Sequence, residues 1–340
     1  MKKVLLFVFL FIIVFISACT SLVESPPVVP KEPEISVFRE AQDGRPIRFA
    51  HGQHGDTWMG LMLAGFLEAC DDYGLLCDHS AVAGLDEAPV ISYVEQMTSE
   101  NTSGLMIGMW YESRYILAEQ LDKAGVPFVS PHVLLPAELN GLGLAGAGPD
   151  VDGYALAAGR AMAEKVNCEG PVAFSQSSLL PQENQVTEGF QTGFRELCPD
   201  TEFLEKIAIG PTDTAKAIAL AGAELTAHPD VVAAMSSTAH GGMAWAKAAE
   251  ENGKEPGEIV IQGMDGMPAN LDLVKSGEIW VLVGQPVFEE AYYSVVLLVN
   301  NLMGFPVPYE NLLPAPQITI DNADDFYEIV EKAQEAALGK

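Results

Sequence analysis

Aromatic and polar side chains follow the short apolar runs in the first part of the chain. His54, Asp56 and Trp58 come after the first of these runs, and Trp110 and Tyr111 come after the third. An indole ring can stack on the apolar face of a ligand, and a carboxylate accepts charge-assisted hydrogen bonds from hydroxyl groups. Together these groups suit a binding site for a small polyhydroxylated molecule.

The second part of the chain supplies a complementary set of polar groups. Each of them ends an apolar run or begins the helical pattern that follows, and the candidates are Gln176, Asn184, Thr238, His240, Asp265 and Gln285. Among them, the aspartate can accept two hydroxyl groups of one ligand. We therefore expect ligand contacts from both parts of the chain.

Ordinary structural roles compete with these assignments. Trp58 could be a packing residue inside its own lobe, because tryptophan is usually buried. Tyr111 could be a hinge or lid contact, and Asp265 could cap a helix or form a turn.

Predicted strands and helices alternate along the whole chain. Strands are expected at 47–50, 75–79, 104–109, 126–130, 172–175, 203–209, 231–236, 259–263, 279–284 and 318–320. Helices are expected at 58–73, 88–99, 113–124, 152–166, 184–197, 214–227, 241–251, 288–303 and 324–337, with a short one after 263. Such alternation indicates parallel sheets that are covered by helices.

The pattern restarts near residue 152, which favours two similar α/β lobes over one large sheet. We assign 46–148 plus 287–312 to an N-terminal lobe and 149–286 plus 313–338 to a C-terminal lobe. The chain would then cross between the lobes several times and form a hinge. Ligands of such sheets lie outside the carboxyl ends of the strands, where the candidate residues are.

The first residues have the features of an export signal. Lys2 and Lys3 precede an apolar run at 4–16 that is too short for an ordinary membrane-spanning helix. The sequence from Ile16 to Cys19 resembles a bacterial lipobox, which implies cleavage after residue 18 and lipid attachment to Cys19. A plain signal with a chance cysteine is the alternative. The proline-rich segment 19–45 is predicted to be an extended tether.

Four cysteines remain after Cys19, and an even number in an exported protein favours disulfide bonds. Pairing of neighbouring elements predicts Cys70–Cys77 and Cys168–Cys198. Four reduced thiols are the alternative.

The charge balance excludes nucleic-acid binding as a main function. The chain has 47 acidic and 18 basic residues, with a formal net charge of −29. Binding to nucleic acid requires a basic surface that displaces counterions.

Several motifs resemble those of type 1 periplasmic sugar-binding proteins, the ribose-binding group above all. Gly52-Gln53 with Asp56-Thr57-Trp58 is similar to the ligand loop of that family, and Thr187-Glu188-Gly189-Phe190 to a helix of its second lobe. Met264-Asp265-Gly266 resembles its aromatic–Asp–Gly motif, and Gly284-Gln285-Pro286 its Gln–Asn–Pro motif. The resemblance covers roughly residues 46–335.

This resemblance implies a monomeric, two-lobed protein that needs no cofactor and delivers a sugar-like ligand to an ABC permease. Trp58 would stack on the sugar, while Asp265 and Gln285 would form hydrogen bonds with its hydroxyl groups. The sequence departs from the family at Asn184, where many sugar binders have arginine, and at Thr238-Ala239, where they have Asn-Asp.

Three other functions were weighed. A sensor subunit for a signalling molecule would have the same fold, and its sequence would look the same. A metal-binding receptor could use His51, His54, His132 and His240, but their spacing matches no metal motif. An enzyme is not expected, because the chain has no nucleophile elbow, phosphate-binding loop or dinucleotide fingerprint.

Overall fold

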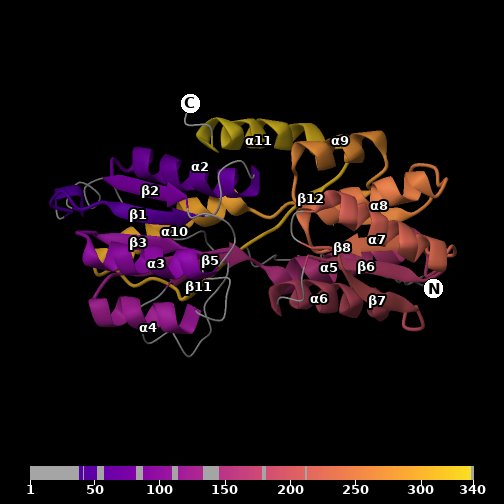
Figure 1. The fold of residues 1–340 in the computed structure, drawn as a ribbon, viewed down its shortest axis with the longest axis horizontal. Coiled ribbons are helices and arrows are strands. Elements are labelled where there is room, and N and C mark those ends of the chain that lie inside the picture. Colours follow the sequence, from indigo (N-terminus) through magenta and orange to yellow (C-terminus); the bar gives the residue numbers. More distant parts are fainter. Residues whose placement is uncertain are drawn as a thin grey trace, which may run out of the picture.

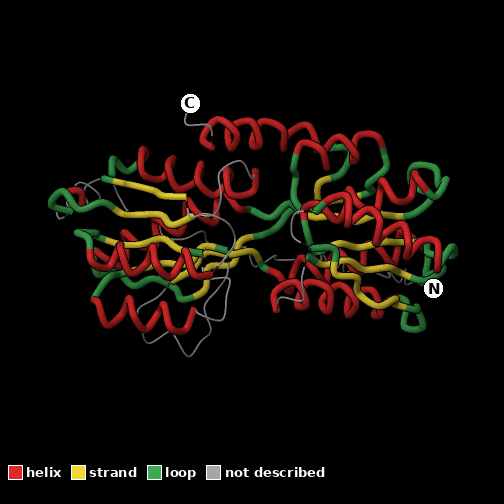
Figure 2. Tube along the Cα trace, viewed as in Figure 1, coloured by secondary structure: helices red, strands yellow, loops and turns green. Residues whose placement is uncertain are grey.

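The computed structural model describes residues 38–40, 42–51, 57–81, 87–108, 114–132, 145–177, 181–210 and 213–337. Over these residues the chain forms two sheets of parallel strands flanked by helices (Figures 1 and 2). The predicted fold class is thus confirmed. No helix in this part of the chain is long and apolar enough to span a membrane.

The first sheet has the strand order β11-β5-β4-β3-β1-β2. Its strands are β1 (Ile47–His51), β2 (Cys77–Ala81), β3 (Gly104–Ile107), β4 (Phe128–Pro131), β5 (Ala145–Pro149) and β11 (Glu310–Leu313), and every pairing is parallel. Helices α2 (Thr57–Asp72) and α10 (Val287–Leu302) pack on one face, and α3 (Glu87–Ser99) and α4 (Arg114–Ala124) on the other. The central strands β1, β3, β4 and β5 are therefore buried on both faces, as their apolar residues require.

The second sheet has the strand order β12-β10-β9-β8-β6-β7. Its strands are β6 (Val172–Gln176), β7 (Phe203–Ala208), β8 (Ala233–Ser236), β9 (Val260–Met264), β10 (Val281–Val283) and β12 (Gln317–Ile318), and only β12 is antiparallel to its neighbour. Helices α5 (Val151–Val166) and α6 (Pro181–Leu197) cover one face. Helices α7 (Thr214–Ala227), α8 (Ala239–Glu251), α9 (Pro268–Ser276) and α11 (Ala323–Ala337) cover the other.

The chain passes between the two sheets three times, after β5, after β10 and after β11. The last helix, α11, contributes Ala323 and Val330 to the core of the second lobe. It also packs against α2 of the first lobe, so it lies across both (Figure 1). An ion pair of 2.6 Å between Lys275 and Asp324 joins it to α9.

Two strands differ from the sequence prediction, which had none at 145–149 or 310–313. β5 has the sequence AGAGP, which lacks the β-branched side chains typical of strands. Gly148 is nevertheless suited to this place, because a Cβ atom there would lie 2.6 Å from the carbonyl oxygen of His132. The close approach of the neighbouring backbone requires glycine.

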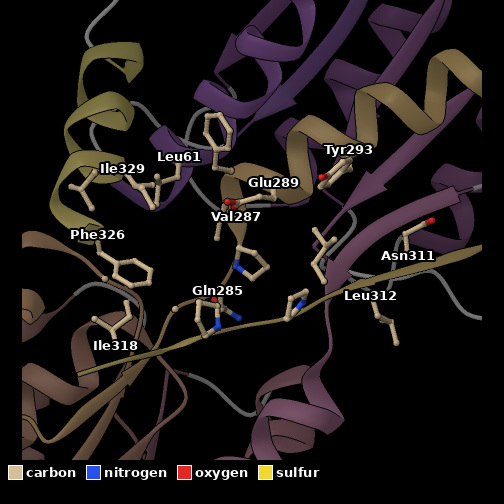
Figure 3. Close-up of a pocket in the computed structure, with 18 of the residues that line it drawn as sticks. Leu61, Gln285, Val287, Glu289, Tyr293, Asn311, Leu312, Ile318, Phe326 and Ile329 are labelled. Carbon is tan, nitrogen blue, oxygen red and sulfur yellow. The ribbon is translucent and has the colours of Figure 1, made fainter. Parts of the chain in front are cut away.

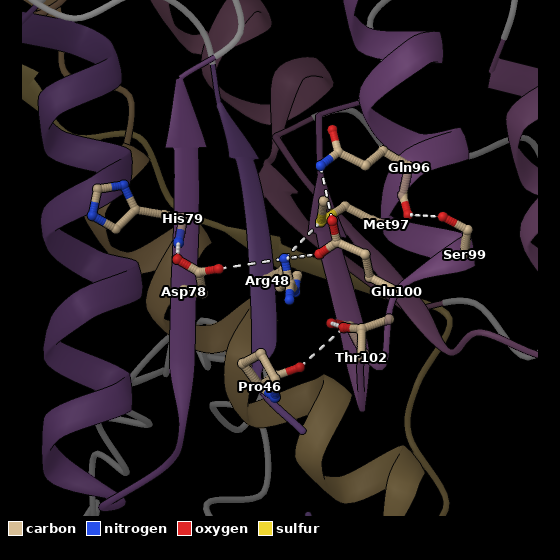
Figure 4. A network of polar contacts seen from close by, with 10 residues as sticks. Pro46, Arg48, Asp78, His79, Gln96, Met97, Ser99, Glu100 and Thr102 are labelled. Atoms are coloured by element: carbon tan, nitrogen blue, oxygen red, sulfur yellow. Dashed lines mark hydrogen bonds and ion pairs between the residues drawn. The ribbon is translucent and has the colours of Figure 1, made fainter. Parts of the chain in front are cut away.

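A polar network ties together the amino-terminal ends of the first strands. Arg48 of β1 contacts Glu100 at 2.6 Å, Asp78 of β2 at 3.4 Å and the sulfur of Met97 at 3.1 Å (Figure 4). Since ligands of parallel sheets lie at the carboxyl ends, this network serves the fold and leaves the opposite end for binding.

Candidate functional site

The first lobe contributes a cluster of Trp58, which is half-buried, and His132 and Glu290, which are buried, at the carboxyl end of its sheet. Trp58 is the second residue of α2, and its ring meets the His132 ring edge to face at 4.9 Å. His132 follows β4 and has a left-handed backbone (φ 68°). Its Nδ1 lies 2.9 Å from Oε2 of Glu290 in the first turn of α10. The tryptophan and the charged pair therefore form one unit.

Close packing of α10 against α2 sets this geometry. A Cβ atom on Gly65 would collide with the carbonyl oxygen of Phe288, so glycine lets the start of α10 approach the middle of α2. This contact fixes the position of Glu290, two residues further along α10. The carboxylate is fully buried, and its Oε1 accepts no hydrogen bond from the described residues.

The second lobe presents Asp265, Tyr154 and Gln285. Asp265 follows β9 with a left-handed backbone (φ 62°), and its N–H donates to Val283 O at 2.8 Å. The side chain of Asn270 donates to Asp265 O at 3.1 Å and holds the turn. Gln285 follows β10 and lies close to the hydroxyl of Tyr154 on α5, which has no hydrogen bond of ordinary geometry among the described residues.

The two sets face each other across the hinge. Gln182 of α6 brings its side-chain amide to 3.4 Å from Nε2 of His132. Burial disfavours the charged form of His132, but the charge and hydrogen bond of Glu290, helped by Asp265, outweigh it and raise the pKa of His132. Burial also raises the pKa of Tyr154, and the charge of Asp265 raises it further. The approach of Gln182 to His132 thus brings a side chain of the second lobe against the cluster of the first.

Four other predicted residues lie around the carboxyl end of the second sheet. Gln176 is fully buried and donates to Glu183 O at 3.0 Å and to Thr187 Oγ1 at 2.7 Å. These bonds tie it to α6, while its Oε1 accepts no hydrogen bond from the described residues, and its predicted ligand role remains a prediction. Asn184 of α6 accepts a hydrogen bond of 2.6 Å from Lys206.

Thr238 and His240 lie at the start of α8. Thr238 is buried, and its Oγ1 is 3.2 Å from Oγ of Ser236. His240 places Nε2 2.7 Å from Gly210 O. Burial lowers the pKa of His240, although the hydrogen bond to Gly210 opposes this effect. The ligand roles predicted for these residues remain predictions.

Several predicted functional residues lie outside the described residues. They are Cys19, His54, Asp56, Trp110 and Tyr111. Ligand contacts were not predicted from the sequence for His132, Glu290, Tyr154 or Gln182. His132 was considered only as a metal ligand, and its position directly after a strand was the available signal.

The structure gives no support to the metal-binding alternative where it can be examined. Nε2 of His51 lies 3.1 Å from Nδ1 of His79, while His132 pairs with Glu290. Within the described ranges, no three His, Cys, Asp or Glu side chains come together as metal ligands.

Both predicted disulfide bonds are present. Cys70–Cys77 links the end of α2 to the start of β2, with a Cα–Cα distance of 6.2 Å. Cys168–Cys198 links the segments that follow α5 and α6, with a Cα–Cα distance of 5.3 Å. Each bond lies within one lobe, so neither restrains the movement of one lobe against the other.

Comparison with known sequences places this architecture in a family. The sequence profile described as "Periplasmic binding protein domain" matches residues 47–305, which cover both lobes. The chain belongs to the periplasmic binding protein family. Proteins of this family bind solutes and are not enzymes. No curated protein matches the chain.

Solved structures of other periplasmic binding proteins have the same fold. The periplasmic ribose ABC transporter protein of Conexibacter woesei is 17% identical, with a TM-score of 0.75 over 86% of this chain and 98% of that one. A solute-binding protein of Burkholderia graminis, in complex with D-arabinose, is 19% identical, with a TM-score of 0.74 over 82% and 97%. An arabinose-binding protein of Geobacillus stearothermophilus is 22% identical, with a TM-score of 0.71 over 83% and 99%.

Proposed function

We propose that this periplasmic binding protein captures a monosaccharide or a similar small polyol between its lobes and delivers it to an ABC importer. The observation that carries the proposal is the meeting of two sets of groups at the hinge. Trp58, His132 and Glu290 come from the first lobe, and Asp265, Tyr154 and Gln285 from the second. The ligands named for similar structures, arabinose and ribose among them, support the same class of solute.

The chemistry of these groups suits a sugar. An indole can stack on the apolar face of a sugar ring, as aromatic side chains do in many ligand sites. Asp265 can accept charge-assisted hydrogen bonds from ligand hydroxyls, and the Tyr154 hydroxyl can exchange a hydrogen bond with another. A ligand that contacts both lobes stabilises the closed arrangement, so that binding becomes a conformational signal for the importer.

A binding screen tests this function. Thermal shifts should be measured with pentoses, hexoses, polyols and purine nucleosides, each with and without EDTA, and calorimetry should follow on the best ligand. We expect a pentose, hexose or polyol to raise the melting temperature, and EDTA to change nothing. Stabilisation by nucleosides alone would contradict the sugar assignment, and loss of binding in EDTA would restore the metal alternative.

The proposal includes export and lipid attachment at Cys19. Mass spectrometry of protein made in a bacterium with intact lipoprotein processing should find acyl groups on an N-terminal Cys19. An unmodified terminus at another residue would refute this part of the proposal and leave the binding function unaffected.

A further inference from the structure

A cavity lies between the crossover segments and α11, apart from the cluster at the hinge. Its volume is about 770 Å³, within the range of sites for drug-sized molecules. Figure 3 shows Leu61 and Tyr293 of the first lobe on its walls, together with Ile318 and Phe326 of the second. The cavity is therefore built by both lobes.

The lining is mainly apolar, and parts of it are open to solvent. Leu312 and Ile329 are each 39% exposed. Exposed apolar surface of this kind commonly marks a binding site. Among the described residues of the lining, the charged ones are Glu289 and Glu310, and none is a lysine, arginine or histidine.

Glu289 gives the cavity its chemical character. Its carboxylate lies among the apolar walls at the first turn of α10 (Figure 3). Glu289 is an exposed residue at the mouth of the cavity, and among the described residues no ion pair engages it. The surrounding protein atoms raise its pKa, since the charged form loses solvation there. A cation in the cavity would offset that loss.

We propose that this cavity is a second binding site, for a small organic cation that joins an ammonium group to a compact hydrocarbon or aromatic body. The ammonium group would lie at Glu289, and the body would cover the apolar wall of Leu61, Phe326 and Ile329 (Figure 3). An anionic ligand is disfavoured, because it would meet two carboxylates and no cationic side chain among the described lining residues.

Such a ligand would be coupled to the hinge cleft. The walls belong to both lobes, so a rotation of one lobe against the other changes the shape of the cavity. Gln285 lines the cavity and also lies close to Tyr154 in the cleft. A ligand that prefers one arrangement of the lobes must change the sugar affinity, and the sugar must change its affinity by the same factor. This coupling rests on the proposed sugar-binding function.

Three probes with one body and different head groups test the site directly. They are 4-phenylbutylammonium, 4-phenylbutanol and 4-phenylbutanoate. Each is titrated into the full chain after signal removal, with Cys19→Ser to prevent lipid attachment. We expect the ammonium probe to bind roughly threefold to tenfold more tightly than the alcohol, with the carboxylate weakest.

Variants locate the binding. Glu289→Gln should abolish the preference for ammonium over alcohol. Glu328→Gln makes the same charge change on an exposed residue of α11 outside the lining, and should preserve the preference. Ile329→Gln changes a partly exposed side chain and should weaken all three probes. Equal affinities for the three probes, or a preference that survives Glu289→Gln, would overturn the proposal, as would absence of binding.

The coupling has its own measurement, the sugar affinity with and without saturating ammonium probe. A changed sugar affinity, matched by an equal change in probe affinity, is the expected result. An unchanged sugar affinity would refute the coupling. If no sugar binds but the ammonium probe does, the proposed function fails and the second site stands. If sugar binds and the probe does not, only the second site fails.

Discussion

Replacing Glu290 with glutamine removes one negative charge from beside His132 and hardly changes the size of the side chain. The carboxylate is fully buried, the histidine side chain is 10% exposed, and their atoms are 2.9 Å apart. In the parent, this partner raises the pKa of His132 against the effect of burial. Once the charge is gone, burial should dominate, and the pKa of His132 should fall below its ordinary value of about 6.5.

The stability of the unliganded protein should fall in a pH-dependent way. A buried charge-assisted hydrogen bond contributes about 1.5–3 kcal/mol and a neutral one about 0.5–1.5 kcal/mol, so we expect a loss of about 1–2 kcal/mol where His132 is charged. A histidine with a raised folded pKa contributes stability that is fully present below its unfolded pKa. That contribution is lost as the pH rises through the folded pKa. The difference between parent and Glu290→Gln should therefore be larger at pH 5.5 than at pH 8.

Two measurements check this reasoning. Nuclear magnetic resonance titration of the imidazole follows the pKa of His132, and urea unfolding at both pH values gives the free energies of unfolding. Glu196→Gln is the matched control, because it breaks the exposed Arg160–Glu196 ion pair and should leave stability nearly unchanged at either pH. A His132 pKa that stays above its ordinary value in Glu290→Gln, or a stability loss that does not depend on pH, would refute the reasoning.

Three further predictions concern the cleft, the disulfide bonds and the helix packing. By calorimetry with the best sugar, Trp58→Ala and Asp265→Ala should each weaken binding by about 1–3 kcal/mol; parent-like affinity in variants that remain folded would show that the site is misplaced. The Cys168–Cys198 bond closes a longer loop (separation 30) than Cys70–Cys77 (separation 7). Replacing its cysteines by serine should therefore lower the free energy of unfolding in urea by about 1 kcal/mol more than the same change at Cys70 and Cys77. The reverse order would contradict this entropic account. Gly65→Ala should lower the free energy of unfolding by about 1–3 kcal/mol or more, because the new methyl group would collide with α10. The control Gly222→Ala, where only a side-chain atom lies 3.7 Å away, should be neutral or slightly stabilising. Equal effects would show that α10 does not need the glycine.

Most of the fold followed from local patterns in the sequence. Strands such as β6 (Val172–Gln176) are short apolar runs, and helix α7 (Thr214–Ala227) has the predicted bounds. These elements were predictable because periodicity is a property of neighbouring residues. β5 was not, because its alanines and glycines form a strand only where another backbone passes close to Gly148.

The candidate site was less accessible to sequence reasoning. Asp265 and Gln285 could be selected because they end strands within recognisable motifs. Glu290 was missed, because an acidic residue in the first turn of a helix is usually a solvated group that interacts with the helix dipole. Its burial depends on the approach of α10 to α2, and the raised pKa of His132 depends in turn on Glu290. Because each of these contacts depends on another tertiary contact, the local sequence does not reveal them.

Because α11 lies across both lobes, it can affect ligand affinity without contacting the ligand. Three crossover segments join the two lobes and restrict them to rotation about a narrow axis. Helix α11 packs on α2 at a distance from these crossovers. Opening therefore requires two helices to slide or part, and this adds to the free-energy difference between open and closed forms. Apparent affinity scales with the population of the binding-competent form. Substitutions along the α2–α11 contact thus offer a means of tuning solute capture and release without altering which solute is recognised.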